Sequence, residues 1–330
     1  MLLHVCRGDL VESYHTGSIV VVTSNGQVLS AIGDSQRSVF ARSSMKLLQV
    51  IPALELGIKE KFDLSASAIS LFCASHSGED QHTTTVKKLL NDGGLTCDAL
   101  KCGTHPPRHI STYEKGLQNQ IVFGPEHNNC SGKHTAMLLS ALANGESLED
   151  YYLQEHPVQQ RILQTISEIC EYPLEKIVLG IDGCGVPVHG LPLYNIALGY
   201  ANLCANDKYN EKKTAAIDTM KQSIIKAPEM IGGTDRFCTE LIKVGNGELI
   251  AKAGAEGVYC IGHQTKKIGI VIKIDDGNSR ASYPVAMEVL KQLELIDEKQ
   301  YEYLVAFAKP SVLNVRGEKV GEIIPQFQLF

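Results

Sequence analysis

The sequence predicts a mixed α/β protein of the α+β type, in which strands from both ends of the chain form an antiparallel sheet and helices fill the middle. Three observations lead to this class. Two β-rich runs near the N-terminus are joined by turn residues, the patterns between about residues 43 and 245 are mainly helical, and strand patterns return after residue 245. Successive hairpins favour antiparallel pairing over the parallel sheet that alternating strands and helices would build.

The N-terminal hairpin is the clearest local pattern. Ile19–Ser24 and Gln27–Ile32 are rich in β-branched residues, and Asn25 followed by Gly26 separates them. This dipeptide adopts the left-handed backbone that a tight two-residue turn requires. We therefore expect the two runs to pair as neighbouring strands.

Helical patterns dominate the middle of the chain. A short helix is expected to open at Ser43, to be kinked or ended by Pro52 and to stop at Gly57. The other expected helices are Thr83–Leu90, His134–Ala143, Val158–Glu171 and Lys212–Ile225. Glycine and proline clusters at Gly103–Pro107 and Gly180–Pro192 separate them.

Strand patterns return in the last third of the chain. The expected strands are Glu248–Lys252, Gly257–Ile261 and Lys267–Ile274, followed by a helix at Tyr283–Leu293 and an extended tail at Val312–Ile324. We expect a discontinuous sheet-containing domain from residues 1–60 and 246–330. A mainly helical region, residues 61–245, packs on it and carries active-site loops; a single compact unit is the alternative.

Charge and composition exclude several classes of protein. The 330 residues include 31 Lys and Arg against 37 Asp and Glu, a net charge of −6, whereas nucleic-acid binding needs clustered cations. No apolar run approaches the roughly 18 residues of a membrane-spanning helix. Residues 1–20 carry charged side chains and no apolar signal-peptide core. We therefore expect a cytoplasmic globular protein with no nucleic-acid or membrane partner.

The ten cysteines do not form a recognisable framework. They are spread along the chain, and none is separated from another by two residues, which argues against zinc ribbons and thioredoxin-type redox motifs. In a reducing compartment most of them are expected to be small buried side chains. Any metal site would have to be built from residues that are distant in sequence.

Ser43 and Lys46 form the first candidate catalytic pair. Residues three apart share a helix face, so this hydroxyl and amine can approach each other, whereas Ser44 points elsewhere. A serine needs a base to become a nucleophile, and a lysine can be that base only when neutral, a state that burial and nearby positive charge favour. The same spacing also fits a helix-capping serine with a solvated lysine, so the pair needs supporting motifs.

Three further segments are dense in the small polar residues that active-site loops use. They are Cys73–Glu79, His127–His134 and Lys252–Gly257. A serine–lysine helix, then a polar loop, then a strand with lysine and glycine is the order found in penicillin-recognising enzymes. In that arrangement the late lysine lowers the pKa of the first lysine by its positive charge.

These segments, with Arg42–Lys46 and Asp182–Pro187, resemble the rhizobial-type (class 3) L-asparaginases of the asparaginase II family, nearly from end to end. The resemblance implies a serine β-lactamase-like and glutaminase-like fold and a homodimer. It also implies the site residues. The two catalytic serine–lysine pairs of the family correspond here to Ser43 with Lys46 and to Ser75 with Lys252. The residues that line the substrate pocket correspond to Arg42, His134, Asp182, Cys130 and Cys184. The resemblance also implies a zinc ion beside the pocket, held by Cys130, Lys133 and Cys184.

The implied zinc site is chemically unusual. Two thiolates with an open position suit Zn²⁺, but a lysine ligand must first lose its proton. Taken alone, the spacing of Cys130 and Lys133 favours a buried thiol and a solvated lysine over a metal site.

The function expected from the resemblance is L-asparaginase activity. L-asparagine would be hydrolysed to L-aspartate and ammonia through a β-aspartyl ester on Ser43, with Lys46 as general base. The alternatives are a glutaminase or another serine–lysine amidohydrolase, a penicillin-recognising enzyme, and a non-catalytic zinc-binding protein. Gly232–Asp235 is similar to the threonine nucleophile loop of the bacterial class 1 asparaginases, but it lies too late in the chain, so we expect a turn there instead.

Overall fold

The computed structural model describes all residues from 1 to 330, and the chain forms two compact units. The first unit consists of Met1–Ser44, Leu191–Ala205 and Val244–Phe330, and the second of Met45–Gly190 and Asn206–Lys243. The domain boundaries expected from the sequence, at residues 60/61 and 245/246, stay a prediction. No helix has both the length and the apolar character needed to span a membrane.

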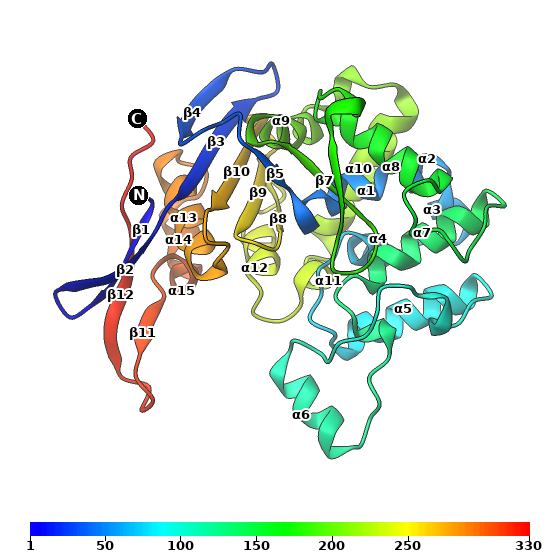
Figure 1. Cartoon of the computed structure of the whole chain (residues 1–330), viewed down its shortest axis with the longest axis horizontal. Helices are drawn as coiled ribbons and strands as arrows, with labels where there is room; N and C mark the ends of the chain where they lie inside the picture. Colours follow the sequence, from blue (N-terminus) through cyan, green and yellow to red (C-terminus); the bar gives the residue numbers. More distant parts are fainter. The chain divides into compact units, whose positions relative to one another are not determined.

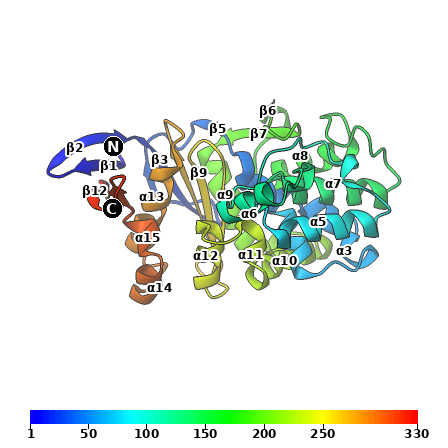
Figure 2. The ribbon, with the colours of Figure 1, turned by 90° about the horizontal axis from the view of Figure 1, so that it is seen from below.

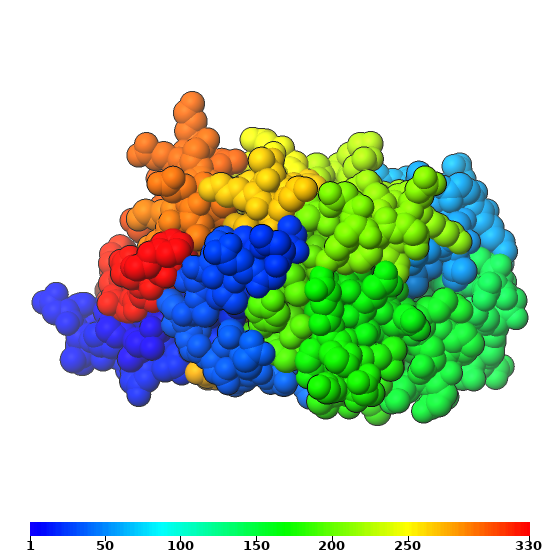
Figure 3. All heavy atoms as spheres, turned by 90° about the horizontal axis from the view of Figure 1, so that it is seen from above, coloured from blue at the N-terminus to red at the C-terminus, as the bar shows by residue number.

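The first unit joins the two ends of the chain in one sheet. β1 and β12 pair in antiparallel register from Leu3 opposite Pro325 to Arg7 opposite Gly321, and they lie side by side in Figure 1. The N-terminal and C-terminal atoms are also neighbours on the surface in Figure 3. In order, this sheet contains β11 (Ser311–Leu313), β12 (Lys319–Pro325), β1 (Leu3–Arg7) and β2 (Leu10–His15).

A second, five-stranded sheet forms the core of the first unit. Its order is β4 (Val28–Ile32), β3 (Gly17–Thr23), β10 (Ile268–Ile274), β9 (Val258–His263) and β8 (Leu249–Ala253). Every residue of β9 and β10 is buried, so both faces of these strands are covered. The helices α9 (Leu193–Cys204) and α13 (Ser279–Gln292) pack on them. At Gly269 a Cβ atom would lie 1.9 Å from the Ala197 carbonyl oxygen, so this glycine allows α9 to approach the strand closely.

The second unit is mainly helical. Its centre is α7 (Ser131–Ala143), in which residues 131–141 are all buried, and which packs against α5 (Asp80–Asp92) and α8 (Pro157–Ile169) (Figure 2). The other helices are α1 (Lys46–Gln49), α2 (Ile51–Glu55), α3 (Ile58–Lys61), α4 (Ala66–Phe72), α6 (Ile110–Gln118), α10 (Glu211–Lys226), α11 (Glu229–Gly232) and α12 (Phe237–Val244). A hairpin of β6 (Val178–Ile181) and β7 (Pro187–Pro192) completes the unit.

The predicted fold class is confirmed. The structure is mixed α/β, both ends of the chain contribute strands, and the pairs within both sheets of the first unit are antiparallel. The N-terminal hairpin forms as β3 and β4, and Gly26 at its turn has φ +85°, the left-handed conformation that glycine adopts easily.

Candidate active site

Ser43 lies on a 3₁₀ turn (Arg42–Met45) that runs directly into α1. Lys46 is the first residue of α1, and its pairing with Ser43 stays a prediction. The Ser44 hydroxyl donates to the Ala41 carbonyl at 2.7 Å and points elsewhere, as the sequence predicts. Ser43 is half-buried, and Lys46 is only 1% exposed, which excludes a solvated lysine at this position.

The chain is strained immediately before Ser43. Arg42 has φ +55°, a left-handed conformation that non-glycine residues adopt only where their surroundings enforce it. In the same unit, the turn after β8 lies against this segment: a Cβ at Gly254 would be 2.7 Å from the Ala41 carbonyl oxygen. The Arg42 guanidinium is 4.0 Å from the Glu256 carboxylate. The first unit therefore holds Arg42 and Ser43 beside the turn that follows Lys252.

The second unit brings Lys46 and Ser75 together. Lys46 Nζ donates to the Ala74 carbonyl, to Ser75 Oγ at 3.1 Å and to Cys130 Sγ at 3.2 Å. Lys252, on β8, is 1% exposed, and its Nζ donates to the carbonyl of Ala253 at 2.7 Å. The pairing of Ser75 with Lys252 stays a prediction because these residues belong to different units.

The expected metal ligands lie in one cluster. Cys130 caps the start of α7, Lys133 follows in its first turn, and Cys184 lies in the turn between β6 and β7. The donor atoms of Cys130, Cys184 and Asp182 lie within 4.8 Å of one another, and Lys133 Nζ is 3.0 Å from Cys184 Sγ. Lys133 is 4% exposed, so the alternative of a solvated lysine is excluded here as well. The sequence analysis placed Asp182 in the pocket but did not identify its carboxylate as a metal donor.

The pKa values of the two cysteines in this cluster are shifted in opposite directions, downward for Cys130 and upward for Cys184. A hydrogen bond from the Cys184 thiol lowers the pKa of Cys130 well below its usual value, and the ammonium groups of Lys46 and Lys133 add to this effect against the cost of burial. The same bond, together with burial, raises the pKa of Cys184. Burial disfavours the charged form of Lys133, yet Cys184, Cys130 and Asp182 together raise its pKa.

The donor set fits a zinc-like cation. Cysteine sulfurs and a carboxylate oxygen are common Zn²⁺ ligands, and the lowered pKa of Cys130 favours the thiolate form that binds zinc. Lys133 is held as an ammonium in this arrangement, so it can become a ligand only by releasing its proton. The chemistry therefore supports Cys130, Cys184 and Asp182 as donors more directly than Lys133.

His134 presents a buried nitrogen toward this region. The Tyr151 hydroxyl accepts from the Lys101 N–H at 2.9 Å and shares a hydrogen bond of 2.6 Å with His134 Nδ1. Burial and the charges of Lys133 and Lys46 hold the pKa of His134 well below 6.5, so the ring is neutral. His134 Nε2 is buried and has no hydrogen-bond partner.

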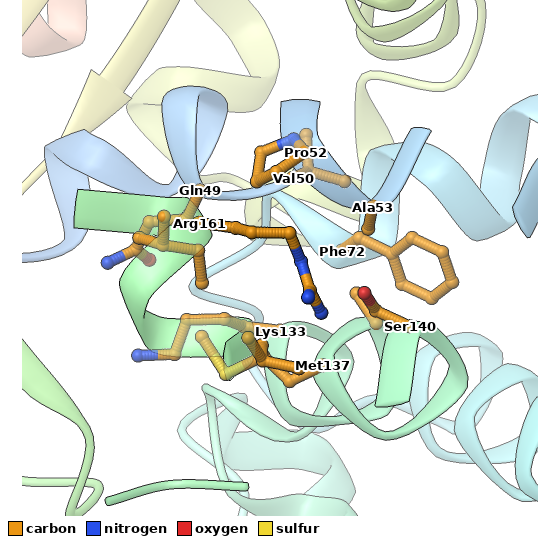
Figure 4. Close-up of a pocket in the computed structure, with 12 residues that line it drawn as sticks. Gln49, Val50, Pro52, Ala53, Phe72, Lys133, Met137, Ser140 and Arg161 are labelled. Atoms are coloured by element: carbon orange, nitrogen blue, oxygen red, sulfur yellow. The ribbon is translucent and has the colours of Figure 1, made fainter. Parts of the chain in front are cut away.

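A small cavity lies next to Lys133 in the second unit (Figure 4). Gln49, Arg161 and Met137 also line it, and its volume is about 10 Å³, which is room for one water molecule and too little for an amino acid. Gln49 Oε1 and Arg161 Nε are buried there without partners. This cavity is therefore not a substrate pocket.

Comparison with known proteins places the chain in a family. A family model described as L-asparaginase II matches residues 3–325. No curated protein matches the sequence. Among solved structures, a β-lactamase of Mycobacterium bovis is similar at 13% identity over 84% of this chain and 94% of its own, with a TM-score of 0.45. A β-lactamase/D-alanine carboxypeptidase of Pseudomonas syringae is similar at 12% identity over 84% and 94%, with a TM-score of 0.43. Both scores lie below 0.5 and carry no functional conclusion.

Proposed function

The chain belongs to the L-asparaginase II family, whose members are asparaginase-type amidohydrolases acting on small molecules, and from this premise we propose that it hydrolyses L-asparagine to L-aspartate and ammonia. The observation that carries the proposal is the position of Lys46. This lysine is buried, follows Ser43 by three residues, and has its amine 3.1 Å from the hydroxyl of a second candidate serine, Ser75.

Ser43 is the proposed nucleophile. Its oxygen attacks the side-chain amide carbon while Lys46, once its ammonium has given up a proton, accepts the hydroxyl proton as general base. Lys46 passes the proton to the departing nitrogen, which leaves as ammonia, and a β-aspartyl ester remains on Ser43. Water then attacks the ester, Lys46 takes its proton, and the Ser43 hydroxyl is restored as aspartate leaves.

Ser75 and Lys252 support this pair in the proposal. The Ser75 hydroxyl, at 3.1 Å from Lys46 Nζ, can relay a proton to or from the lysine. Lys252 is proposed to supply a second positive charge that tunes the electrostatics of the first pair. Arg42, Asp182 and His134 are the residues we propose to contact the substrate; among them, His134 has a ring nitrogen, Nε2, that has no hydrogen-bond partner inside the protein.

Zinc is the proposed metal of the cysteine cluster. Cys130 and Cys184 would hold it, with Asp182 or deprotonated Lys133 as a further ligand. When bound, the ion supplies a fixed positive charge beside the pocket that helps to orient a polar substrate. A homodimer and a cytoplasmic location, both expected from the sequence, belong to the same proposal.

The test is ammonia release from L-asparagine and L-glutamine by the purified protein. Ser43→Ala should abolish release from asparagine, whereas Ser44→Ala, the same change one residue later, should retain it because Ser44 already donates to Ala41. Equal activity in wild type and Ser43→Ala would refute the nucleophile. Release from glutamine alone would indicate a glutaminase, and rapid acylation by a β-lactam would indicate a penicillin-recognising enzyme.

A further inference from the structure

Ser75 lies in a loop, residues 73–79, that joins α4 to α5 and is bound by a distant segment of the second unit. The Ser75 N–H donates to the Ile231 carbonyl at 3.0 Å, and the Ser77 hydroxyl donates to the Gly232 carbonyl at 3.0 Å. Residues 229–234, which we call the α11 segment, therefore fix the backbone of Ser75 directly. The sequence analysis identified part of this segment only as a turn.

Glu79 binds the end of the α11 segment. Its carboxylate accepts two hydrogen bonds from Thr234, one from the backbone N–H and one from the hydroxyl, each at 2.8 Å. Glu79 is 8% exposed, so these bonds form where water competes little. The Thr234 hydroxyl is thus occupied by a carboxylate, which explains why it is not the nucleophile that its sequence context resembles.

Gly233 allows this contact. Its φ is +109°, and a Cβ built on it would lie 2.1 Å from Glu79 Oε1. Any other residue would have both an unfavourable backbone conformation and a collision with the carboxylate. The two features together indicate that Glu79 and the α11 segment fit each other closely.

His82 binds the other end of the segment. The Glu79 N–H donates to His82 Nδ1 at 3.2 Å, and His82 Nε2–H donates to the Glu229 carbonyl at 3.2 Å. His82 is completely buried. The first turn of α5 therefore holds both ends of the α11 segment, whose middle carbonyls bind Ser75 and Ser77.

We propose that Glu79 is a positioning residue for Ser75: its carboxylate locks the α11 segment, and this segment fixes the Ser75 backbone so that the Ser75 hydroxyl stays in contact with Lys46. The proposal rests on the proposed function in one respect, since it assigns Ser75 a part in the reaction. A displacement of a reacting group by about 1 Å can lower a rate by about a hundredfold. Loss of the lock is therefore expected to lower kcat much more than it changes KM.

The test compares Glu79→Ala and Thr234→Val with Asp80→Ala. Asp80 is an exposed carboxylate in the first turn of α5, so its removal controls for the loss of a negative charge at this end of the helix. Hydrogen exchange of the Ser75 amide and the kinetics of asparagine hydrolysis are measured on each variant. Exchange should become faster and kcat should fall by about tenfold to a hundredfold in Glu79→Ala. Thr234→Val, which keeps the backbone bond, should show a smaller change in the same direction, and Glu79→Gln should recover part of the loss.

A double-mutant cycle separates positioning from general destabilisation. If Glu79 acts through Ser75, adding Glu79→Ala to Ser75→Ala should lower kcat no further. An equal fold loss in both backgrounds would show a merely structural role and overturn the proposal. So would a Ser75 amide whose exchange is the same in Glu79→Ala and Asp80→Ala, a result that can be obtained even if the protein does not hydrolyse asparagine.

Discussion

The two candidate serines differ in how their surroundings are built. Ser43 precedes its proposed lysine by only three residues, and the strained Arg42 beside it is also a chain neighbour. Ser75 has distant partners: Lys46 precedes it by 29 residues, and Ile231 holds its backbone. A local motif sets the geometry of the first serine, whereas tertiary packing sets that of the second. Changes to distant residues should therefore affect Ser75 more than Ser43.

Lys46 belongs to both arrangements, and its removal should have the largest effect. Lys46→Met keeps most of the side-chain length but removes the amine that we propose as base, and loss of a general base typically lowers a rate by about 10²- to 10⁴-fold. We expect kcat for asparagine to fall by about 10³-fold in an ammonia-release assay. Lys59→Met, an exposed lysine on α3, is the control. A Lys46→Met enzyme with more than a tenth of wild-type activity would refute the role of base.

The proposed metal site depends on residues that are distant in sequence, so a substitution in it should weaken zinc binding. Cys184→Ser removes one sulfur from a group whose donors come from α7 and from the turn between β6 and β7. Affinity for added Zn²⁺, measured by calorimetry, should fall at least about a hundredfold, because even residues that only support a ligand contribute about 10- to 100-fold. Cys97→Ser, at a half-buried thiol outside the cluster, should bind zinc like wild type. Equal affinities in the two variants would place any zinc elsewhere.

The fold class and most long elements were predictable because their patterns are local. The hairpin at Asn25 and Gly26 and the buried strands β8 to β10 carry strong β signals. The strands β1 and β2 were missed, and β2 is an exposed edge strand with little apolar alternation. The helix α9 was also missed: nearly all its residues are buried, so it shows no amphipathic face, and its partner strands are distant in sequence.

The candidate site was predictable only in part. The spacing of Ser43 and Lys46 indicated a catalytic pair only together with the other polar motifs, and burial of Lys46 excludes the solvated alternative. Ser75, Cys184 and Asp182 were singled out through the resemblance to a family, because no local spacing links them to Lys46 or Cys130. The hydrogen bonds of Tyr151 to His134 and of Glu79 to Thr234 span large sequence separations and could not be predicted from a single sequence.

The smallest expected effect is the contribution of His189 to the pH dependence of the free energy of unfolding. This contribution arises because the fold buries the His189 ring. It lies on β7 and is 2% exposed, and burial together with the charge of Lys133 lowers its pKa from 6.5 to about 4. Above about pH 6.5 the ring is neutral in both folded and unfolded chains, so the histidine adds no pH dependence there. Between pH 6.5 and about 4 the unfolded chain binds a proton that the folded chain does not, and stability falls as the pH falls. From about pH 7.5 to about pH 5 this loss should be about 2 kcal/mol.

His189→Leu tests this expectation because the ring Nδ1 has no hydrogen-bond partner to lose. Urea unfolding of wild type and variant at both pH values gives the difference in pH dependence. The variant should lose about 2 kcal/mol less than wild type on acidification. A parallel pair of pH profiles would show that His189 is already charged or exposed to water in the folded protein. In that case water would reach His189 on β7, whereas Lys46 in the same unit is buried. The residues around the candidate site would then differ in how well the fold shields them from water.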